Sequence, residues 1–563
     1  MKTEFATLYT PFENNLNCDK PWDIYPRPQL KRESFINLNG KWNLEIIRKG
    51  VSSFNGEIIV PFPLESRLSG VSFKKQTDDI LVYTKTIMLT PTEKSIILNF
   101  GAVDQECKVY VNDNFVGENV GGYLPFSFDI TEFIKQGENV FRVEVIDRLD
   151  TELAYGKQTK KRGGMWYTET SGIWQTVWLE EVPKNYIKSI KVKPNLSGFD
   201  ITVFGGENEK SLYINGKKHC FTGNNARIEI ENPINWTPEN PHLYNFILIS
   251  GSDEIKSYTA LRTISVKGNK ILLNNKPYFF HGLLDQGYFS DGIYTPATPE
   301  ALESDILKMK ECGFNMLRKH IKVEHEVFYY YCDKLGMAVF QDLVNCGKYS
   351  FLIDTALPTI GLKKGITHKA TKKRREHFVK TSHDTLSLLY NHPSIVYYTL
   401  FNEGWGQFDA KNLYKIMKEA DPTRVWDATS GWFQTGESDV LSEHIYFKPL
   451  KLKNDGRPLV LSEIGGYSSK IQNHSFNKTK TYGYKFFNDN EEFKSALLKL
   501  YYNEVIPAIK SQGLCATVLT QVSDVEDETN GLLTYDRQIL KVDPTEMTAM
   551  AKALFEAYNE FIS

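Results

Sequence analysis

The sequence predicts a multidomain chain in which two β-sandwiches precede a C-terminal (β/α)8 barrel of the TIM type. The 563 residues are too many for one core, since a domain usually holds about 100 to 200 residues. Short segments with alternating polar and apolar residues fill the first half of the chain. After about residue 267, apolar strand-like runs alternate with helical ones, which favours a barrel.

The two predicted sandwiches follow from strand candidates separated by Gly, Asn, Asp and Pro turns. In the first block the candidates are 40–47, 80–89, 95–101, 107–117 and 139–147. In the second block they are 186–195, 199–206 and 243–251. This pattern is typical of antiparallel sandwiches. We therefore expect a jelly-roll-like sandwich over residues 1–183 and a smaller immunoglobulin-like sandwich over residues 184–266.

The barrel is expected over residues 267–563. Its eight strand candidates are 277–284, 314–321, 337–343, 395–404, 424–431, 442–447, 459–466 and 515–524. Helices between them have readable starts: Thr298 is a predicted cap, Pro299 takes the first helical position, and Glu300 lies near the positive end of the helix dipole. The intervals after strands five and six are too short for long helices, so we expect an irregular barrel.

Charge limits the kinds of partner. Lysine and arginine total 67 against 69 aspartate and glutamate, so the net charge of −2 gives no general attraction to nucleic acid or to an acidic membrane. The basic run at 372–375 has no interleaved aromatic residues and precedes a helical pattern, which predicts a solvated helix start. We expect a small neutral substrate and no nucleic acid; the sequence leaves a homo-oligomer open.

Cysteine usage and the N-terminal residues predict the location. The seven cysteines are scattered and never form a C-x-x-C pair, which is typical of reduced thiols in a cytoplasm. The first residues, MKTEFATLYTPFENN, carry early charges and lack the apolar stretch of a signal peptide. No run approaches the ~18 apolar residues of a membrane helix. We therefore expect a cytoplasmic protein without a membrane span.

Two glutamates close predicted strands at the barrel face where such folds carry their reactive groups. Glu403 ends strand four and Glu463 ends strand seven, each after an apolar strand and followed within two residues by a glycine. These strands lie across the barrel mouth, so the two carboxyl groups can converge on one bond. Hydrolysis of a sugar acetal needs such a pair, one protonated for the leaving oxygen and one ionised for attack. Asn402 is a candidate for binding a sugar 2-hydroxyl.

Other polar side chains near the strand ends are candidates for sugar binding, although a structural hydrogen-bonding role stays open for each. They are Asp285, Gln286, Arg318, His320, Asp342, Trp432, His444, Tyr446, Gln521 and Asp524. Arg318 and Tyr446 are the two that we favour as substrate contacts. No His, Cys or acidic cluster has the spacing of a structural zinc site, so we predict no required metal and no cofactor.

Four motifs, taken in order, resemble glycoside hydrolase family 2. They are SGIWQTVWLE (171–180), LRTISVKGNKILLNNKPYFFHGL (261–283), FNEGWG (401–406) and SEIGG (462–466). The resemblance implies a sugar-binding-like sandwich, an immunoglobulin-like domain and a catalytic barrel. It also implies a retaining exo-β-glycosidase with Glu403 as acid/base and Glu463 as nucleophile. Tyr446 resembles the strand-six tyrosine that often touches the nucleophile in related barrels.

The chain departs from the family at positions that select the sugar. Relatives with galactosidase or glucuronidase activity typically show Arg-x-Ser-His-Tyr-Pro after strand two, whereas residues 318–322 read RKHIK. The Asn-x-Lys that would hold a uronic carboxylate is absent after Glu463, and Gln521 stands where Trp is common. From the family's common activity we expect a β-galactosidase type. The alternatives are a β-glucuronidase or other β-glycosidase, an inverting hydrolase or transglycosylase, and a catalytically inactive carbohydrate-binding protein.

Overall fold

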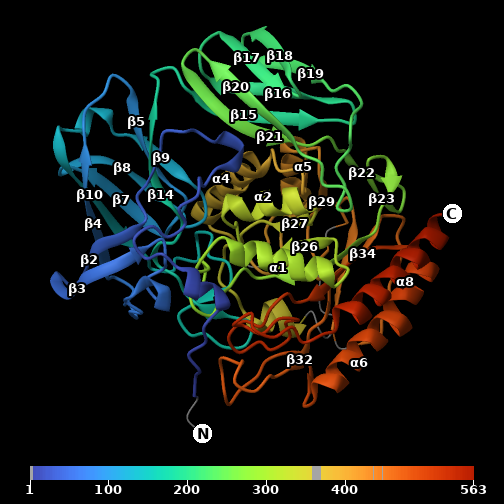
Figure 1. The fold of residues 1–563 in the computed structure, drawn as a ribbon. Coiled ribbons are helices and arrows are strands. Elements are labelled where there is room, and N and C mark those ends of the chain that lie inside the picture. The colour runs from blue at the N-terminus through green and yellow to red at the C-terminus, as the bar shows by residue number, and fades with distance from the viewer. Residues whose placement is uncertain (1–3, 358–368, 435, 447) are drawn as a thin grey trace.

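The computed structural model describes residues 4–357, 369–434, 436–446 and 448–563. Residues 1–3 of the expected N-terminal segment and residue 447 of the sixth strand candidate lie outside that part. Figure 1 shows two β-rich bodies, blue and green, against a central barrel, with α6 and α8 on the side of the barrel away from the first sandwich. The predicted order of sandwich, sandwich and barrel is confirmed.

The first sandwich consists of two antiparallel sheets. One has the order β1 (Phe35–Asn37), β14 (Val177–Val182), β5 (Ser95–Phe100) and β9 (Phe126–Asp129). The other has the order β3 (Val51–Val60), β2 (Gly40–Arg48), β4 (Ile80–Leu89), β10 (Gly137–Ile146), β7 (Glu106–Val111) and β8 (Asn114–Val120). Alternate residues of β2, namely Trp42, Leu44 and Ile46, are buried between the sheets. This alternation is why the sequence pattern located the strands.

Short strand pairs tie the loops of the first sandwich together. They are β6 (Val103–Asp104) with β13 (Gly172–Ile173), and β11 (Gln158–Thr159) with β12 (Tyr167–Thr168). The second pair is parallel and lies in the long connection between β10 and β13. That connection reaches the barrel, as described below.

The second sandwich packs a three-stranded sheet on a four-stranded one. The first is β15 (Ile187–Pro194), β16 (Gly198–Gly205) and β19 (Asn225–Glu229). The second is β18 (Lys217–Thr222), β17 (Glu209–Ile214), β20 (Tyr244–Ser250) and β21 (Asp253–Thr259). A small sheet of β22 (Ile264–Lys267), β23 (Lys270–Leu273) and β24 (Lys276–Pro277) then leads into the barrel. The domain boundaries at residues 183 and 266 stay predictions.

The barrel sheet contains eight parallel strands among the described residues, one for each candidate. Its order is β29 (Val425–Asp427), β28 (Ile395–Thr399), β27 (Ala338–Asp342), β26 (Met316–Lys319), β25 (Phe280–Asp285), β34 (Leu514–Thr520), β31 (Leu459–Gly465) and β30 (Leu441–Ile445). Every residue of β25, β26, β27, β28 and β34 is buried, as expected for strands covered on both faces. The sheet ends at β29 and β30, so the predicted irregularity is also confirmed.

Helices cover the barrel strands. They are α1 (Glu300–Glu311), α2 (Glu326–Leu335), α4 (Lys372–Leu389), α5 (Ala410–Ala420), α6 (Asn490–Leu500), α7 (Ile506–Gln512) and α8 (Pro544–Ile562). Two π-helical turns, Leu352–Ala356 and Tyr501–Val505, and short β32 (Tyr467–Ser469) and β33 (Lys485–Phe487) complete this part. In the described residues, none of these helices lies between β29 and β30 or between β30 and β31. None of the described helices has the length and apolar character needed to cross a membrane.

Two helix starts test the sequence predictions. The basic run begins α4, with the Thr371 hydroxyl accepting a hydrogen bond from the Arg374 amide; Arg374 itself is buried while its basic neighbours are exposed. The predicted cap at Thr298 is wrong. Helix α1 begins at Glu300 with Pro299 in the cap position, and the buried Thr298 hydroxyl has no hydrogen-bond partner among the described residues, so it caps no amide of the helix.

Candidate active site

Glu403 and Glu463 meet at the carboxyl ends of the barrel strands. Glu463 belongs to β31, and its side chain is 7% exposed. Glu403 follows β28 with a φ of +55°, and its amide donates to the Ser430 carbonyl oxygen at 3.0 Å. One ligand atom each from Glu403, Glu463 and His444 lie within 4.8 Å of one another. The two carboxyl groups are therefore close enough to act on the same bond.

Arg318 of β26 connects most of the site. Its guanidinium is buried and donates to the Asp342 carboxylate at 2.9 Å, the Ser462 carbonyl oxygen at 2.9 Å, the Glu463 carboxylate at 3.1 Å, Asn402 Oδ1 at 3.0 Å and the Ser430 hydroxyl at 3.0 Å. A planar guanidinium with five N–H donors suits this set of acceptors. Arg318 therefore fixes Glu463 and Asn402 relative to each other.

Asn402 is oriented by its side-chain oxygen. Its Oδ1 accepts from Arg318 and from the Ser430 hydroxyl, the latter at 2.9 Å. In the described part of the chain, its Nδ2 group makes no hydrogen bond, which leaves an amide donor beside Glu403. The position is suited to a hydroxyl group of a ligand.

The electrostatics of Glu463 keep its carboxyl group ionised. Burial raises the pKa of Glu463, but the charges of His444, Arg318 and His320, together with a hydrogen bond from Tyr446, lower it to about 2. A carboxylate with such a pKa is negatively charged throughout the neutral range. Glu463 is therefore the member of the pair suited to attack an electrophilic carbon.

His444 and Tyr446, from β30 and the residues after it, contact the two glutamates. His444 Nδ1 lies 3.0 Å from a Glu403 carboxylate oxygen and 3.6 Å from one of Glu463. The Tyr446 hydroxyl donates to Glu463 Oε2, and it lies 3.3 Å from the Thr520 hydroxyl. The ring of Tyr446 stacks on Tyr484 with centroids 3.8 Å apart, which holds the phenol in place.

The remaining residues that the sequence predicted for sugar binding each contact a neighbouring side chain. His320 Nδ1 lies 2.8 Å from Asp342, and the Trp432 ring centroid lies 6.4 Å from that of His444. Gln286 donates to the Gln521 side-chain oxygen at 2.9 Å. Two of the acids are held by lysines: Asp285 by Lys319 at 2.6 Å and Asp524 by Lys541 at 2.6 Å. Each of these two carboxylates is thus balanced by an adjacent cation.

Sequence reasoning missed several residues that the structure places at or near the barrel mouth. Ser430 lies just after β29, so the strand-end rule that selected Arg318 could have selected it. Tyr484 and Glu528 lie in loops without a periodic pattern, and no sequence signal pointed to either. Lys157 belongs to the first sandwich, far from the barrel in sequence.

Glu403, His444 and Glu463 are also a group that could hold a metal ion among the described residues. Oxygen and imidazole ligands of this kind bind several divalent ions. Their hydrogen bonds to one another and to Arg318 and Tyr446 account for the arrangement without an ion.

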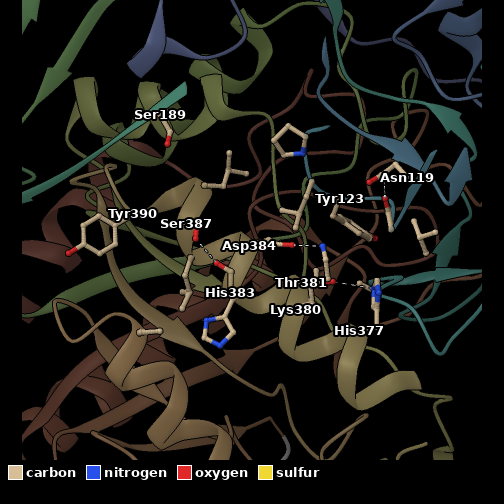
Figure 2. A pocket seen from close by; sticks show the side chains of 18 of the residues that line it. Asn119, Tyr123, Ser189, His377, Lys380, Thr381, His383, Asp384, Ser387 and Tyr390 are labelled. Atoms are coloured by element: carbon tan, nitrogen blue, oxygen red, sulfur yellow. Dashed lines mark hydrogen bonds and ion pairs between the residues drawn. The ribbon is translucent and has the colours of Figure 1, made fainter. Parts of the chain in front are cut away.

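A separate cavity of about 810 Å³ lies between β8 of the first sandwich, β15 and β16 of the second, and α4 (Figure 2). None of its lining residues belongs to the site at the strand ends. Its charged groups have partners, since Lys380 pairs with Asp384 at 2.7 Å and Lys191 lies 4.2 Å from the ring centroid of Tyr390. The cavity is therefore a groove between domains, distinct from the two glutamates.

The fold and the site together define a sandwich-and-barrel protein with two converging carboxyl groups at the barrel mouth. Two family models match the chain: the sugar binding domain of glycosyl hydrolases family 2 over residues 8–183, and the TIM barrel domain of the same family over residues 264–540. The chain belongs to glycoside hydrolase family 2.

Relatives of known name cover parts of the chain. A β-galactosidase of Thermoanaerobacter pseudethanolicus is 30% identical in an alignment 284 positions long that covers 44% of this chain and 37% of that protein. A putative β-glucuronidase of Formosa agariphila is 24% identical over 69% of this chain and 48% of that protein. The chain thus spans less than half the length of these curated relatives.

A solved structure extends the likeness to nearly the whole fold. The β-D-glucuronidase of Dictyoglomus thermophilum superposes with a TM-score of 0.74 and 19% identity, covering 94% of this chain and 98% of that one. At this level of identity the superposition concerns the fold. It agrees with the arrangement of two sandwiches and a barrel in Figure 1.

Proposed function

We propose that the protein is a retaining exo-β-glycosidase that removes terminal β-linked sugars from oligosaccharides or glycosides by double displacement. The observation that carries this proposal is the close approach of Glu403 and Glu463, whose ligand atoms lie within 4.8 Å. Retaining glycosidases hold their two carboxyl groups about 5 to 5.5 Å apart, whereas inverting ones need about 6.5 to 9.5 Å to admit water. The observed spacing favours retention.

The two glutamates have different roles in this mechanism. The Glu463 carboxylate attacks the anomeric carbon, and Glu403 gives its proton to the leaving oxygen as the glycosidic bond breaks. The product of this step is a glycosyl ester on Glu463. Glu403, now ionised, takes a proton from a water molecule that attacks the same carbon and releases Glu463. Two inversions give net retention.

The neighbouring residues support these roles. Arg318 and Tyr446 hold the Glu463 carboxylate, so the attacking oxygen is positioned before the sugar binds. The free Nδ2 group of Asn402 is placed to donate to a sugar 2-hydroxyl. Trp432, His320 and Gln286 stay candidates for further contacts with the sugar.

The finer specificity is also a proposal: a β-galactosidase type acting on a neutral sugar. Relatives such as the protein of T. pseudethanolicus carry the β-galactosidase name.

We further propose a cytoplasmic location. All seven cysteines, each in the described part of the chain, are free thiols, as expected in a reducing compartment.

Trapping the covalent ester tests the proposed function. A dinitrophenyl 2-deoxy-2-fluoro-β-galactoside, or the matching glucoside, is expected to label the protein, because fluorine slows both steps while the good leaving group speeds the first. The label should map to LVLSEIGGYSSK (459–470). Glu463→Gln should abolish labelling, and the matched control Glu443→Gln on adjacent β30 should retain it.

The stereochemistry of the first product gives a second readout. NMR at early times should show the β-anomer of the released sugar. Release of the α-anomer, or a label on a residue other than Glu463, would show that the assigned roles are wrong. The absence of turnover on every nitrophenyl β-glycoside would favour a catalytically inactive carbohydrate-binding protein.

A further inference from the structure

A connection of the first sandwich, residues 147–171 between β10 and β13, reaches the barrel mouth. The Tyr155 hydroxyl donates to the Gly347 carbonyl oxygen at 2.8 Å and accepts from the Trp405 indole at 3.1 Å. The rings of Trp166 and Trp405 are in edge contact, with centroids 4.7 Å apart. Trp405 lies two residues after Glu403, so this connection is fixed directly beside the candidate active site.

Lys157 lies in this connection between two parts of the barrel mouth. On one side, Gly156 has a φ of +64°, and a Cβ atom there would lie 3.1 Å from the carbonyl oxygen of Ile321, the residue after His320. On the other side, the Lys157 carbonyl oxygen accepts from the Tyr167 amide at 3.1 Å. The Tyr167 hydroxyl in turn donates to the Glu528 carboxylate. The backbone at Gly156 and Lys157 thus lies between Ile321, which follows His320, and Tyr167, which donates to Glu528.

The Lys157 side chain is half-buried, and its ammonium group makes no hydrogen bond or ion pair with any described residue. Its charge nevertheless acts on Glu528 and on His320. Burial raises the pKa of Glu528, and Lys157 opposes that rise. Burial lowers the pKa of His320, and Lys157 lowers it further. A partly buried cation without a protein partner is well suited to bind a polar ligand.

Glu528 offers the complementary group. It is buried in the loop after β34. Its Oε2 atom accepts two hydrogen bonds, one from the Tyr167 hydroxyl and one from the Gln521 side-chain amide at 3.1 Å. Within the described chain, Oε1 accepts no hydrogen bond. Gln521 directly follows Thr520, whose hydroxyl contacts Tyr446, and Tyr446 donates to Glu463. Glu528 is therefore linked to the proposed nucleophile through Gln521, the peptide bond to Thr520, and Tyr446.

We propose that Lys157 of the first sandwich and Glu528 of the barrel bind hydroxyl groups of the terminal sugar and select a neutral sugar. The ammonium donates to one hydroxyl oxygen, and the free carboxylate oxygen accepts from a hydroxyl group. Their opposite charges balance each other, so a sugar carboxylate placed between them would meet Glu528 as well as Lys157. This proposal rests on the proposed glycosidase function and adds two specificity-determining residues to it.

The test compares Lys157→Met, Glu528→Gln and a matched control, Lys161→Met, which removes an exposed lysine from the same connection. On the nitrophenyl β-glycoside that the wild type hydrolyses best, kcat/KM should fall about 10- to 150-fold for Lys157→Met, as for one lost hydrogen bond to a charged group. Glu528→Gln should cause a loss in the same range. Lys161→Met should match the wild type.

A series of 3-, 4- and 6-deoxy glycosides distinguishes sugar contact from a structural role. If Lys157 binds a hydroxyl group, the wild type and Lys157→Met should become equal on the substrate that lacks this group. Equal losses on every deoxy substrate, or a kcat/KM for Lys157→Met within about 3-fold of the wild type, would overturn the proposal. A loss confined to a glucuronide would also overturn it, because Lys157 would then bind a carboxylate.

Two measurements keep the outcomes separate. Thermal unfolding of each variant shows whether it is folded; a misfolded Lys157→Met is replaced by Lys157→Gln, which keeps a polar side chain. Turnover by the wild type and labelling of its Glu463 test the proposed glycosidase function without any Lys157 or Glu528 variant. Wild-type activity together with unaffected Lys157 variants refutes only the present inference.

Discussion

Replacing Arg318 by methionine is expected to disrupt the site through the groups that Arg318 now holds. The substitution removes donors to Asp342, Asn402, Ser430 and Glu463 while keeping a long side chain. Each hydrogen bond to a charged group contributes about 1.5 to 3 kcal/mol. Losing the contact to Glu463 and the orientation of Asn402 should therefore lower kcat/KM at least about 100-fold, or about 2.7 kcal/mol.

The same substitution should change the pH dependence. Burial raises the pKa of Glu463, but the charges of His444 and then Arg318 contribute to lowering it to about 2, below its ordinary value of 4.5. Ionised Glu463 therefore stabilises the folded protein above about pH 4.5, and this contribution, on the order of 3 kcal/mol, is lost as pH falls towards 2. Without Arg318 the pKa rises. The acid limb of kcat/KM and the onset of acid unfolding should both move to higher pH.

The assay follows kcat/KM and thermal unfolding from pH 3 to 8 for three variants. Arg318→Lys keeps the charge but reaches fewer acceptors, so it should show a smaller shift and serves if Arg318→Met does not fold. The control is Arg424→Lys, since Arg424 is also buried but lies away from the two glutamates, where it binds the Ile395 carbonyl oxygen at the amino end of β28 and pairs with Asp421. An unchanged acid limb in a folded Arg318→Met would refute the reasoning.

Two further predictions concern chemistry and specificity. Glu403→Ala should reduce hydrolysis of poor leaving groups at least about 100-fold more than that of activated nitrophenyl glycosides, since only the former need a proton to depart. Azide should restore turnover as a β-glycosyl azide; equal losses without this product would exclude Glu403 as the acid. The enzyme should also prefer a neutral glycoside to a glucuronide, because an unpaired buried carboxylate costs several kcal/mol. Comparable kcat/KM values on the two would contradict this.

Sequence reasoning located the strands because their residues are buried in a regular pattern. The alternation in β2 and the continuous burial of β28 both have a direct physical cause, the number of covered faces. The position of Glu403 and Glu463 at strand ends follows from the same pattern. For this reason the predicted order of sandwich, sandwich and barrel agrees with the structure.

The surroundings of the two glutamates could not be predicted in the same way. The ion pair between Asp285 and Lys319 depends on which neighbouring strands pair and in which register. The ion pair between Asp524 and Lys541 joins two loop segments of irregular conformation. The connection that carries Tyr155 and Trp166 reaches the barrel mouth from the first sandwich. Such contacts arise from tertiary packing, and no local pattern in the sequence records them.

The connection that carries Tyr155 and Trp166 also restricts which domains of this protein could be exchanged with those of another protein. Because these rings pack on Gly347 and Trp405, a barrel grafted onto a foreign sandwich would lose one wall of its mouth while keeping all eight strands. Exchange of whole domains between relatives therefore has to include residues 147–171 together with the barrel loops they contact. An exchange that leaves out either side of this interface would remove the contacts of Tyr155 and Trp166 with the barrel loops.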